Sequence, residues 1–243
     1  MKRILVCEDE DTIRDFVVIN LERSGYNVTE AENGEEALTA FDKAVSDNSP
    51  FDVALLDIMM PGIDGIEVCK ILREKCKSLG IIMLSAKSQE IDKVKSLMTG
   101  ADDYITKPFS PSELIARVDA VHRRVEVSRP AFEAVSDESS EPDEILVSGV
   151  FEVDTKKRTI CKNKQAIELT QVEYQILKFF IKNVDTALER KSILKQIWGE
   201  PYYGDDKVID VNIRRLRMKI EQDPSNPVHI QTVWGFGYKW SSD

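Results

Sequence analysis

Two apolar stretches of the sequence each end in acidic residues. ILVC, residues 4–7, is followed by Glu8 and Asp9, and VALL, residues 53–56, is followed by Asp57. Short apolar runs of this kind are typical of strands that are buried on both faces of a parallel sheet. Ligands of such sheets bind outside the carboxyl ends of the strands, so we expect the three carboxylates to meet in one crevice. Carboxylates so close repel one another unless a cation lies among them, and an all-oxygen site suits Mg²⁺.

Two further strand ends carry groups that complement such a crevice. The apolar run IIML, residues 81–84, ends at Ser85, and a strand predicted over residues 103–106 ends at Lys107. A hydroxyl, an ammonium and a divalent cation together can hold a phosphoryl group on a carboxylate. Taken singly, each residue is weak evidence, because acids at strand ends are common in turns and N-caps. Their joint placement at four strand ends favours Asp57 as a phosphoryl acceptor.

Alternating strands and helices in the first half of the chain position these groups. The predicted strands span residues 3–7, 27–31, 53–56, 81–85 and 103–106. The predicted helices span residues 11–24, 34–45, 64–77, 89–99 and 111–124. This alternation predicts an α/β fold, a doubly wound parallel sheet of five strands with helices on both faces. Gly25 and Gly100 stand where C-terminal capping glycines are expected, and Ser110 stands where an N-cap is expected.

Composition divides the chain of 243 residues into three parts. Residues 1–124 carry a net charge of −7 and residues 144–243 a net charge of +2, whereas residues 125–143 are acidic and aperiodic. We therefore predict two domains that are joined by a flexible acidic linker. No apolar run approaches the roughly 18 residues of a membrane span, and the four cysteines form no CxxC pair. We expect a cytoplasmic protein with reduced thiols, no zinc site and no membrane partner.

The second domain begins with four short alternating stretches that predict a small antiparallel sheet. They span residues 145–147, 151–154, 159–161 and 165–168. Thr170, followed three residues later by Glu173, matches a capping box and predicts the start of a helix. Two more helices are predicted near residues 190–198 and 205–221, and HIQTVWGFGYKW predicts a C-terminal hairpin. These elements indicate an α+β domain.

The helix predicted over residues 205–221 is amphipathic. At 100° per residue, one narrow stripe that should face the core consists of Ile209, Ile213, Leu216 and Ile220. The opposite side carries Lys207, Val211, Arg214, Arg215 and Met218, flanked by Arg217. A cationic helix face can enter the major groove of DNA, where arginine matches guanine edges and phosphates. Such faces are more often simply solvated, and three aspartates dilute the charge, so this pattern alone leaves both interpretations open.

Four motifs within residues 1–124 together resemble the receiver domain of two-component response regulators: ILVCEDE, LLDIMMPGIDG, IIMLSAK and GADDYITKPFSPSEL. The resemblance implies a flavodoxin-like fold in which a sensor histidine kinase phosphorylates Asp57. It assigns Mg²⁺ to Glu8, Asp9, Asp57 and the backbone carbonyl of Met59. It also implies that Ser85 and Lys107 contact the phosphoryl group and that Tyr104 is a switch aromatic. Such a domain is a phosphoacceptor that assists its own phosphorylation and dephosphorylation, and is otherwise not an enzyme.

The second domain resembles the winged helix-turn-helix domain of OmpR/PhoB-family response regulators over residues 144–240. The resemblance rests on ELTQVEYQILKFFIKN, VIDVNIRRLRMKIE and QTVWGFGYKW. It implies that the helix over residues 205–222 enters the major groove and that residues 233–238 form the wing. The implied contacts with promoter DNA come from Lys207, Val211, Asn212, Arg214, Arg215, Arg217, Thr232 and Trp234. Among these, Val211 and Arg215 would face bases, whereas Trp234 stands where arginine is frequent and removes one positive charge from the wing.

The same family resemblance implies a homodimer that forms on phosphorylation. The residues that match its interface are Lys93, Val94, Leu97, Asp102, Asp103, Glu113, Ala116, Arg117 and Arg124. Family analogy pairs Lys93 with Glu113, and Asp103 with Arg117, across the two subunits. Exposed ion pairs contribute little stability each, so an ordinary solvated surface is the alternative. RNA polymerase is a further candidate partner of the DNA-bound protein.

Three functions fit these residues, and the leading one is a transcription factor that phosphorylation controls. A phosphohydrolase with an aspartyl-phosphate intermediate would usually carry a second acid two residues after the nucleophile, where this sequence has Met59. A regulator that binds DNA independently of phosphorylation is the third. Degenerate receivers of that kind typically lose an acid or the lysine. This sequence retains all of the pocket residues, which are Glu8, Asp9, Asp57, Ser85 and Lys107.

Overall fold

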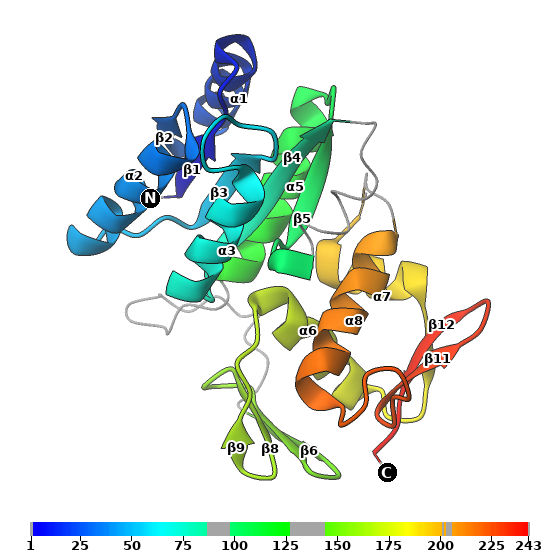
Figure 1. Cartoon of the computed structure of the whole chain (residues 1–243). Helices are drawn as coiled ribbons and strands as arrows, with labels where there is room; N and C mark the ends of the chain where they lie inside the picture. Colours follow the sequence, from blue (N-terminus) through cyan, green and yellow to red (C-terminus); the bar gives the residue numbers. More distant parts are fainter. Residues whose placement is uncertain (1, 87–97, 127–143, 201, 203–205, 243) are drawn as a thin grey trace.

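The computed structural model describes residues 2–86, 98–126, 144–200, 202 and 206–242. The described residues up to 126 fold around a parallel sheet, and those from 144 onward form a second unit beside it (Figure 1). None of the helices in these ranges is long and apolar enough to cross a membrane.

The first domain contains the predicted five-stranded parallel sheet. Its strands are β1 (Arg3–Cys7), β2 (Asn27–Ala31), β3 (Val53–Asp57), β4 (Gly80–Ala86) and β5 (Asp103–Lys107). They are arranged in the order β2-β1-β3-β4-β5, and all four pairings are parallel. The chain therefore reverses its direction of winding between β1 and β3, which places the crevice for ligands at their carboxyl ends.

Helices cover both faces of this sheet, and β1 shows how the sequence directs them. Successive side chains of a strand point to opposite faces. Ile4 and Val6 pack in one buried cluster with α1 (Asp11–Arg23) and α5 (Pro111–Glu126). Leu5 and Cys7 pack in another with α2 (Gly34–Ser46) and α3 (Gly65–Lys75). The four consecutive apolar residues of β1, Ile4 to Cys7, are therefore what a doubly covered sheet requires.

Local capping explains where the helices begin. Asn33 caps α2 and Asp64 caps α3, each by accepting a hydrogen bond from a backbone N–H three residues later. Ser110 Oγ accepts from the backbone N–H of Glu113, so the predicted N-cap of α5 is confirmed. The φ angles of Gly25 and Gly100 are positive, as expected of glycines that end a helix.

The last two predicted helices of the first domain both border on segments outside the described residues. The helix predicted over residues 89–99 falls largely outside the described residues. The helix predicted over residues 111–124 continues to Glu126 as α5, two residues into the segment that we assign to the linker. Val125 is buried, and its packing explains why the helix continues. The division into domains and linker remains a prediction.

The second domain opens with the predicted antiparallel sheet. It contains β6 (Ile145–Ser148), β7 (Phe151–Asp154), β8 (Thr159–Lys162) and β9 (Gln165–Ala166), paired in that order. The capping box of Thr170 and Glu173 is present at the start of α6 (Gln171–Lys182). Two helices follow, α7 (Arg190–Trp198) and α8 (Lys207–Ile220).

A second sheet closes this domain. The predicted hairpin is formed by β11 (Ile230–Val233) and β12 (Gly237–Trp240), and β10 (Ala187–Glu189) pairs with the outer side of β12. β10 was not predicted, because three residues are too few to show an alternating pattern. Three helices and a terminal hairpin of this kind constitute a winged helix-turn-helix domain.

The two domains share one continuous set of buried apolar contacts. Receiver-side residues such as Leu79 and Ala101 belong to the same cluster as Val211 and Leu216 of α8. α5 contacts both α6 and α7, so the second domain lies against the side of the first that β5 and α5 form (Figure 1).

Candidate functional site

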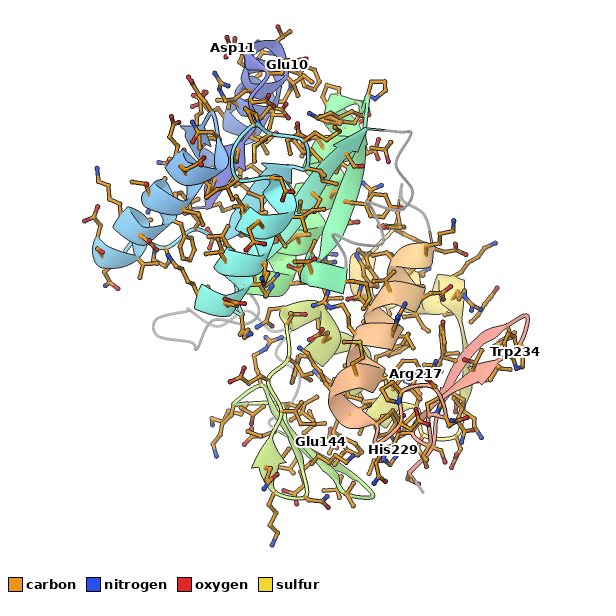
Figure 2. All side chains as sticks on the ribbon, in the orientation of Figure 1. Glu10, Asp11, Glu144, Arg217, His229 and Trp234 are labelled. Carbon is orange, nitrogen blue, oxygen red and sulfur yellow. The ribbon has the colours of Figure 1, made fainter. Side chains whose placement is uncertain are left out.

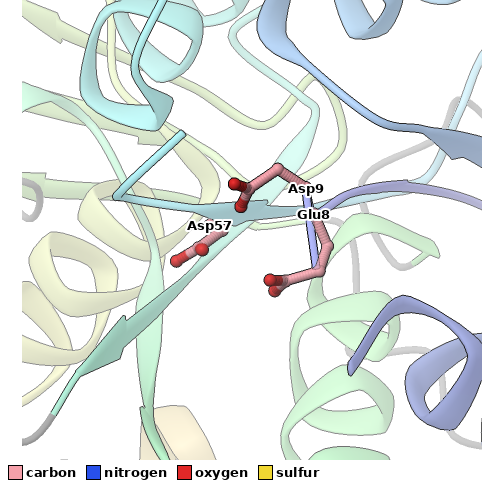
Figure 3. Close-up of side chains that lie close together, drawn as sticks. All are labelled: Glu8, Asp9 and Asp57. Atoms are coloured by element: carbon pink, nitrogen blue, oxygen red, sulfur yellow. The ribbon is translucent and has the colours of Figure 1, made fainter. Parts of the chain in front are cut away.

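Three carboxylates converge at the carboxyl ends of β1 and β3, as the sequence predicts. Glu8, Asp9 and Asp57 each place a carboxylate oxygen within 4.8 Å of the others (Figure 3). The cause is register, since Cys7 pairs with Leu56 and both strands therefore end at the same level of the sheet. Glu8 is fully buried and Asp57 nearly so, whereas Asp9 is exposed. The cluster is thus open to solvent on the side of Asp9.

Lys107 joins this cluster from the end of β5. Its Nζ lies 2.9 Å from Asp57 Oδ2 and 2.7 Å from Glu8 Oε2. Burial raises the pKa of Glu8 to about 7; the hydrogen bond from Lys107 opposes this and the charge of Asp57 adds to it. Burial disfavours the Lys107 ammonium, but its hydrogen bonds to Glu8 and Asp57 outweigh that effect and raise its pKa. One cation therefore offsets part of the negative charge, and the cluster still suits a second cation.

The remaining receiver residues lie around the end of β3. Ser85 is buried, and the pairing of Asp57 with Leu84 puts it one residue beyond Asp57 along the neighbouring strand. Tyr104, the predicted switch aromatic, is also buried, on β5. Met59 follows the strand, and its side chain is exposed.

Gly65 is a residue of this site that the sequence analysis did not single out. A Cβ atom at this position would lie 1.8 Å from the backbone oxygen of Asp57, so α3 can begin against the end of β3 only if the residue is glycine. The backbone of Ile58 also accepts a hydrogen bond from the Gly65 N–H. The signal in the sequence is the Asp-Gly pair after the MetProGly break, where Asp64 is the N-cap and Gly65 the first helical residue.

The predicted DNA-contacting residues of α8 divide into two groups. Lys207 and Arg214 are exposed, in agreement with the predicted outer face, and so is Met218 on the same face, which is not a predicted DNA contact. Val211, Asn212 and Arg215 are instead buried. Arg215 donates to the backbone oxygen of Ala101 in the receiver at 3.0 Å and lies 2.8 Å from Glu173 Oε1. The helical pattern correctly separates the core stripe of α8 from the other positions of the helix. It cannot show that the receiver covers part of the remaining surface of α8.

The wing carries one prominent side chain. Trp234 is 91% exposed at the turn between β11 and β12 (Figure 2). Arg217 ties α8 to this hairpin, because its guanidinium donates to Ile230 O at 2.7 Å and to Thr232 Oγ1 at 2.9 Å. Burial lowers the pKa of Arg217, although nearby acidic groups oppose that effect. Arg217 and Thr232 thus have a structural role whether or not they also contact a phosphate.

Most of the predicted dimer-interface charges in the described residues form ion pairs within the chain itself. Arg117 Nη1 lies 3.0 Å from Asp103 Oδ1, and Arg117 Nη2 lies 3.0 Å from Glu113 Oε1. Asp102 pairs with Arg73 at 2.8 Å, and both are buried in the receiver. Ala116 is partly buried and Arg124 is buried. Lys93, Val94 and Leu97 lie outside the described residues, and so does the predicted pairing of Lys93 with Glu113.

Comparison with known protein families agrees with this architecture. The family described as the response regulator receiver domain matches residues 4–119, and the family described as transcriptional regulatory protein, C terminal, matches residues 164–240. The sensory transduction protein RegX3 of Mycobacterium tuberculosis is 41% identical over 239 residues, covering 98% of this chain and 99% of RegX3. The alkaline phosphatase synthesis transcriptional regulatory protein PhoP of Bacillus subtilis is 42% identical over 238 residues, covering 98% and 96%. A solved mutant of RitR matches the fold with a TM-score of 0.71 at 23% identity over 99% of both chains.

A receiver with its acidic pocket and a winged-helix domain define a response regulator of a two-component system. More particularly, the chain belongs to the OmpR/PhoB family of these regulators, whose members regulate transcription rather than act as typical enzymes.

Proposed function

We propose that this chain is a cytoplasmic transcription factor whose activity depends on phosphorylation of Asp57 by a sensor histidine kinase. The observation that supports this most strongly is the convergence of three carboxylates with the Lys107 ammonium at adjoining strand ends. In the proposed step, an Asp57 oxygen forms a bond to phosphorus while the bond from phosphorus to the kinase histidine nitrogen breaks. The histidine retains the electron pair of that bond and takes up a proton.

The donor set of the pocket fits Mg²⁺. Three carboxylates supply hard oxygen ligands, and the exposed position of Asp9 leaves room for the water ligands that Mg²⁺ usually keeps. Glu8, Asp9, Asp57 and the backbone carbonyl of Met59 would hold the ion, which when bound would neutralise charge on the phosphoryl oxygens. Lys107 already lies beside Asp57, and its ammonium would pair with one phosphoryl oxygen. Ser85 would donate a hydrogen bond to another phosphoryl oxygen.

The test of this proposal uses Mg²⁺ and a small acyl phosphate as phosphoryl donor. Intact mass and binding to promoter DNA are measured together before and after incubation. A stable adduct of one phosphoryl group that increases DNA binding supports the proposal. Rapid turnover of phosphate esters would instead support a phosphohydrolase. DNA binding without any adduct would support a regulator that is independent of phosphorylation.

We propose that the phosphorylated protein forms a homodimer through the face that contains Asp103, Glu113 and Arg117. Two copies on adjacent half-sites would double the number of phosphate contacts, which compensates for the net charge of only +2 in residues 144–243. Treatment with an acyl phosphate or a phosphate mimic should raise the apparent mass in sedimentation velocity. A phosphorylated protein that remains monomeric at tens of micromolar would contradict this assignment.

The proposed roles of two α8 side chains predict different effects on DNA binding. Arg215→Ala should relax sequence preference, because the Arg215 guanidinium would pair with a base edge. We expect a loss of about 1–3 kcal/mol of binding free energy on cognate DNA and none on scrambled DNA. Lys207→Ala should weaken binding to all sequences and flatten its salt dependence, because a phosphate contact carries no sequence information. Titration of cognate and scrambled duplexes at several salt concentrations measures both effects. Equal losses on the two duplexes for Arg215→Ala would refute its base-reading role.

A further inference from the structure

Arg14 is a charged residue on the buried face of α1, beside the acidic pocket. The other buried residues of this helix are Val17, Val18 and Leu21, all apolar, whereas the Arg14 side chain is 8% exposed. A buried guanidinium is costly unless hydrogen bonds and opposite charges compensate for its lost hydration. The contacts of Arg14 therefore explain why a charge is kept at this position.

The Arg14 guanidinium holds the chain segment that carries two of the pocket carboxylates. Its Nη1 donates a hydrogen bond to the backbone oxygen of Glu8 at 2.8 Å, and both groups are buried. This oxygen belongs to the peptide bond between Glu8 and Asp9. Because a peptide group is planar, a hydrogen bond that fixes its carbonyl also fixes the directions in which the two residues leave it.

The same segment lies beyond the end of a strand and before the first helix. β1 ends at Cys7, and the Glu8 N–H still donates to the backbone oxygen of Ala31 at 3.1 Å. Glu10 is the N-cap of α1, and among the described residues its side chain makes no capping hydrogen bond. Arg14 thus restrains the chain between its contact with β2 and its first helical turn.

Three acidic side chains hold the guanidinium in the orientation that serves Glu8. Nη2 lies 2.6 Å from Asp11 Oδ1 and 3.4 Å from Glu32 Oε1, and Nε lies 3.6 Å from Glu30 Oε2. Burial lowers the pKa of Arg14, but the hydrogen bond and charge of Asp11 and the charges of the other two acids outweigh this effect and raise it. The guanidinium therefore stays charged, and each of its three nitrogens faces a partner.

The charge of Arg14 does not by itself explain why it lies beside a pocket that suits Mg²⁺. Two positive charges repel each other, so a cation next to the pocket weakens Mg²⁺ binding unless another effect compensates. Mg²⁺ demands near-ideal octahedral geometry, so the placement of each carboxylate affects its affinity. A hydrogen bond that holds the peptide between Glu8 and Asp9 in place supplies such a compensating effect.

We propose that Arg14 is a positioning residue of the Mg²⁺ site, which acts by orienting Glu8 and Asp9 rather than by contacting the ion or the phosphoryl group. The inference rests on the proposed function, from which it takes these two carboxylates as ligands. Removal of an outer group that orients metal ligands typically lowers metal affinity roughly 10- to 100-fold. The planar fork of arginine donates to the Glu8 oxygen and to the acids at once, which the single ammonium of lysine does not.

Arg14→Met and Arg14→Lys test this role in the full-length chain. Methionine removes every donor, whereas lysine keeps the positive charge and removes only the fork. Arg23→Met is the matched control, because Arg23 is an exposed arginine in the last turn of the same helix. Mg²⁺ alone is titrated by isothermal calorimetry, with Asp9→Asn to identify the heat that arises at the pocket. Far-UV circular dichroism verifies that each variant is folded.

A second measurement separates the affinity for Mg²⁺ from the reaction itself. Phosphorylation by a small acyl phosphate is followed by intact mass at increasing Mg²⁺ concentrations. We expect the dissociation constant and the half-saturating concentration of Mg²⁺ to rise together, about tenfold for Arg14→Met and less for Arg14→Lys. The rate at saturating Mg²⁺ should remain close to that of the wild type, because the contacts of Lys107 with Asp57 are unchanged. Arg23→Met should change neither quantity.

Three results would overturn the proposal. Unchanged or tighter Mg²⁺ binding by folded Arg14→Met would show that Arg14 acts on the pocket through its charge alone or not at all. A slower rate at saturating Mg²⁺ with unchanged affinity would show that Arg14 acts on the reaction and not on the ion. Equal weakening by Arg23→Met would show that the contact with Glu8 is not the cause. Failure of the proposed function is distinguishable, because it appears in the wild type as absence of Mg²⁺ binding or of a phosphoryl adduct.

Discussion

Asp57→Asn should abolish both the phosphoryl adduct and the increase in DNA binding that an acyl phosphate produces. An amide oxygen is a poor nucleophile, and the substitution also removes one of the three carboxylates that converge at the strand ends. The side chain keeps its shape, so the variant should fold and bind DNA as the untreated wild type does. Intact mass spectrometry and DNA titration, with and without the donor, measure the two losses.

Asp64→Asn is the matched control for this substitution. Asp64 lies seven residues further along the chain and caps α3 by accepting a hydrogen bond from the Glu67 N–H at 2.8 Å. Asparagine caps helices about as well as aspartate, so this variant should acquire the phosphoryl group as the wild type does. Phosphorylation of Asp57→Asn at the wild-type rate would show that another residue is the acceptor.

Arg73→Met should cost about 3–5 kcal/mol of the free energy of unfolding, the range found when one partner of a buried ion pair is removed. The Arg73 guanidinium pairs with Asp102 at 2.8 Å and donates to the backbone oxygens of Gly100 and Leu79. Asp102 is 2% exposed, so the variant leaves a carboxylate in the core that, among the described residues, accepts a hydrogen bond from the Ile81 N–H alone. Urea unfolding followed by circular dichroism measures the loss.

Lys75→Met provides the comparison on the same helix. Lys75 pairs with Asp42 at 2.6 Å, but both side chains are exposed. We therefore expect the free energy of unfolding to fall by about 1 kcal/mol or less. The double variant Arg73→Met/Asp102→Asn should recover part of the loss, since it removes the stranded charge. Equal destabilisation by Arg73→Met and Lys75→Met would show that burial of the pair of Arg73 and Asp102 does not increase its contribution to the free energy of unfolding.

The receiver pocket could be predicted from the sequence because its geometry follows from a few local rules. Apolar runs identify buried strands, and parallel strands that end at the same level must bring Glu8 and Asp57 together. The capping box at Thr170 and the core stripe of α8 were predictable for the same reason, since each depends on residues three or four positions apart. Gly65 was missed although the Asp-Gly pair is visible, because its importance depends on how closely α3 approaches the end of β3.

The placement of Arg215 could not be predicted, for a different physical reason. Its neighbours Ala101 and Glu173 are 114 and 42 positions away, and the contact with Ala101 depends on how two separately folded surfaces match. The same limit applies to Asp102. It resembles an interface residue from its position in the sequence, yet its carboxylate is paired inside the receiver. Patterns along a chain report on its own elements and carry little information on a distant domain.

The apolar cluster that runs through both domains has a consequence for how this protein can evolve. Exchange of a whole domain would join this receiver to a DNA-binding domain whose surface has not been matched to it. Here Ala101 and Leu79 of the receiver are buried in one cluster with Val211 of the recognition helix. A substitution that changes the shape of either side must therefore be matched on the other, so the DNA specificity of α8 and the receiver sequence are expected to have been inherited together.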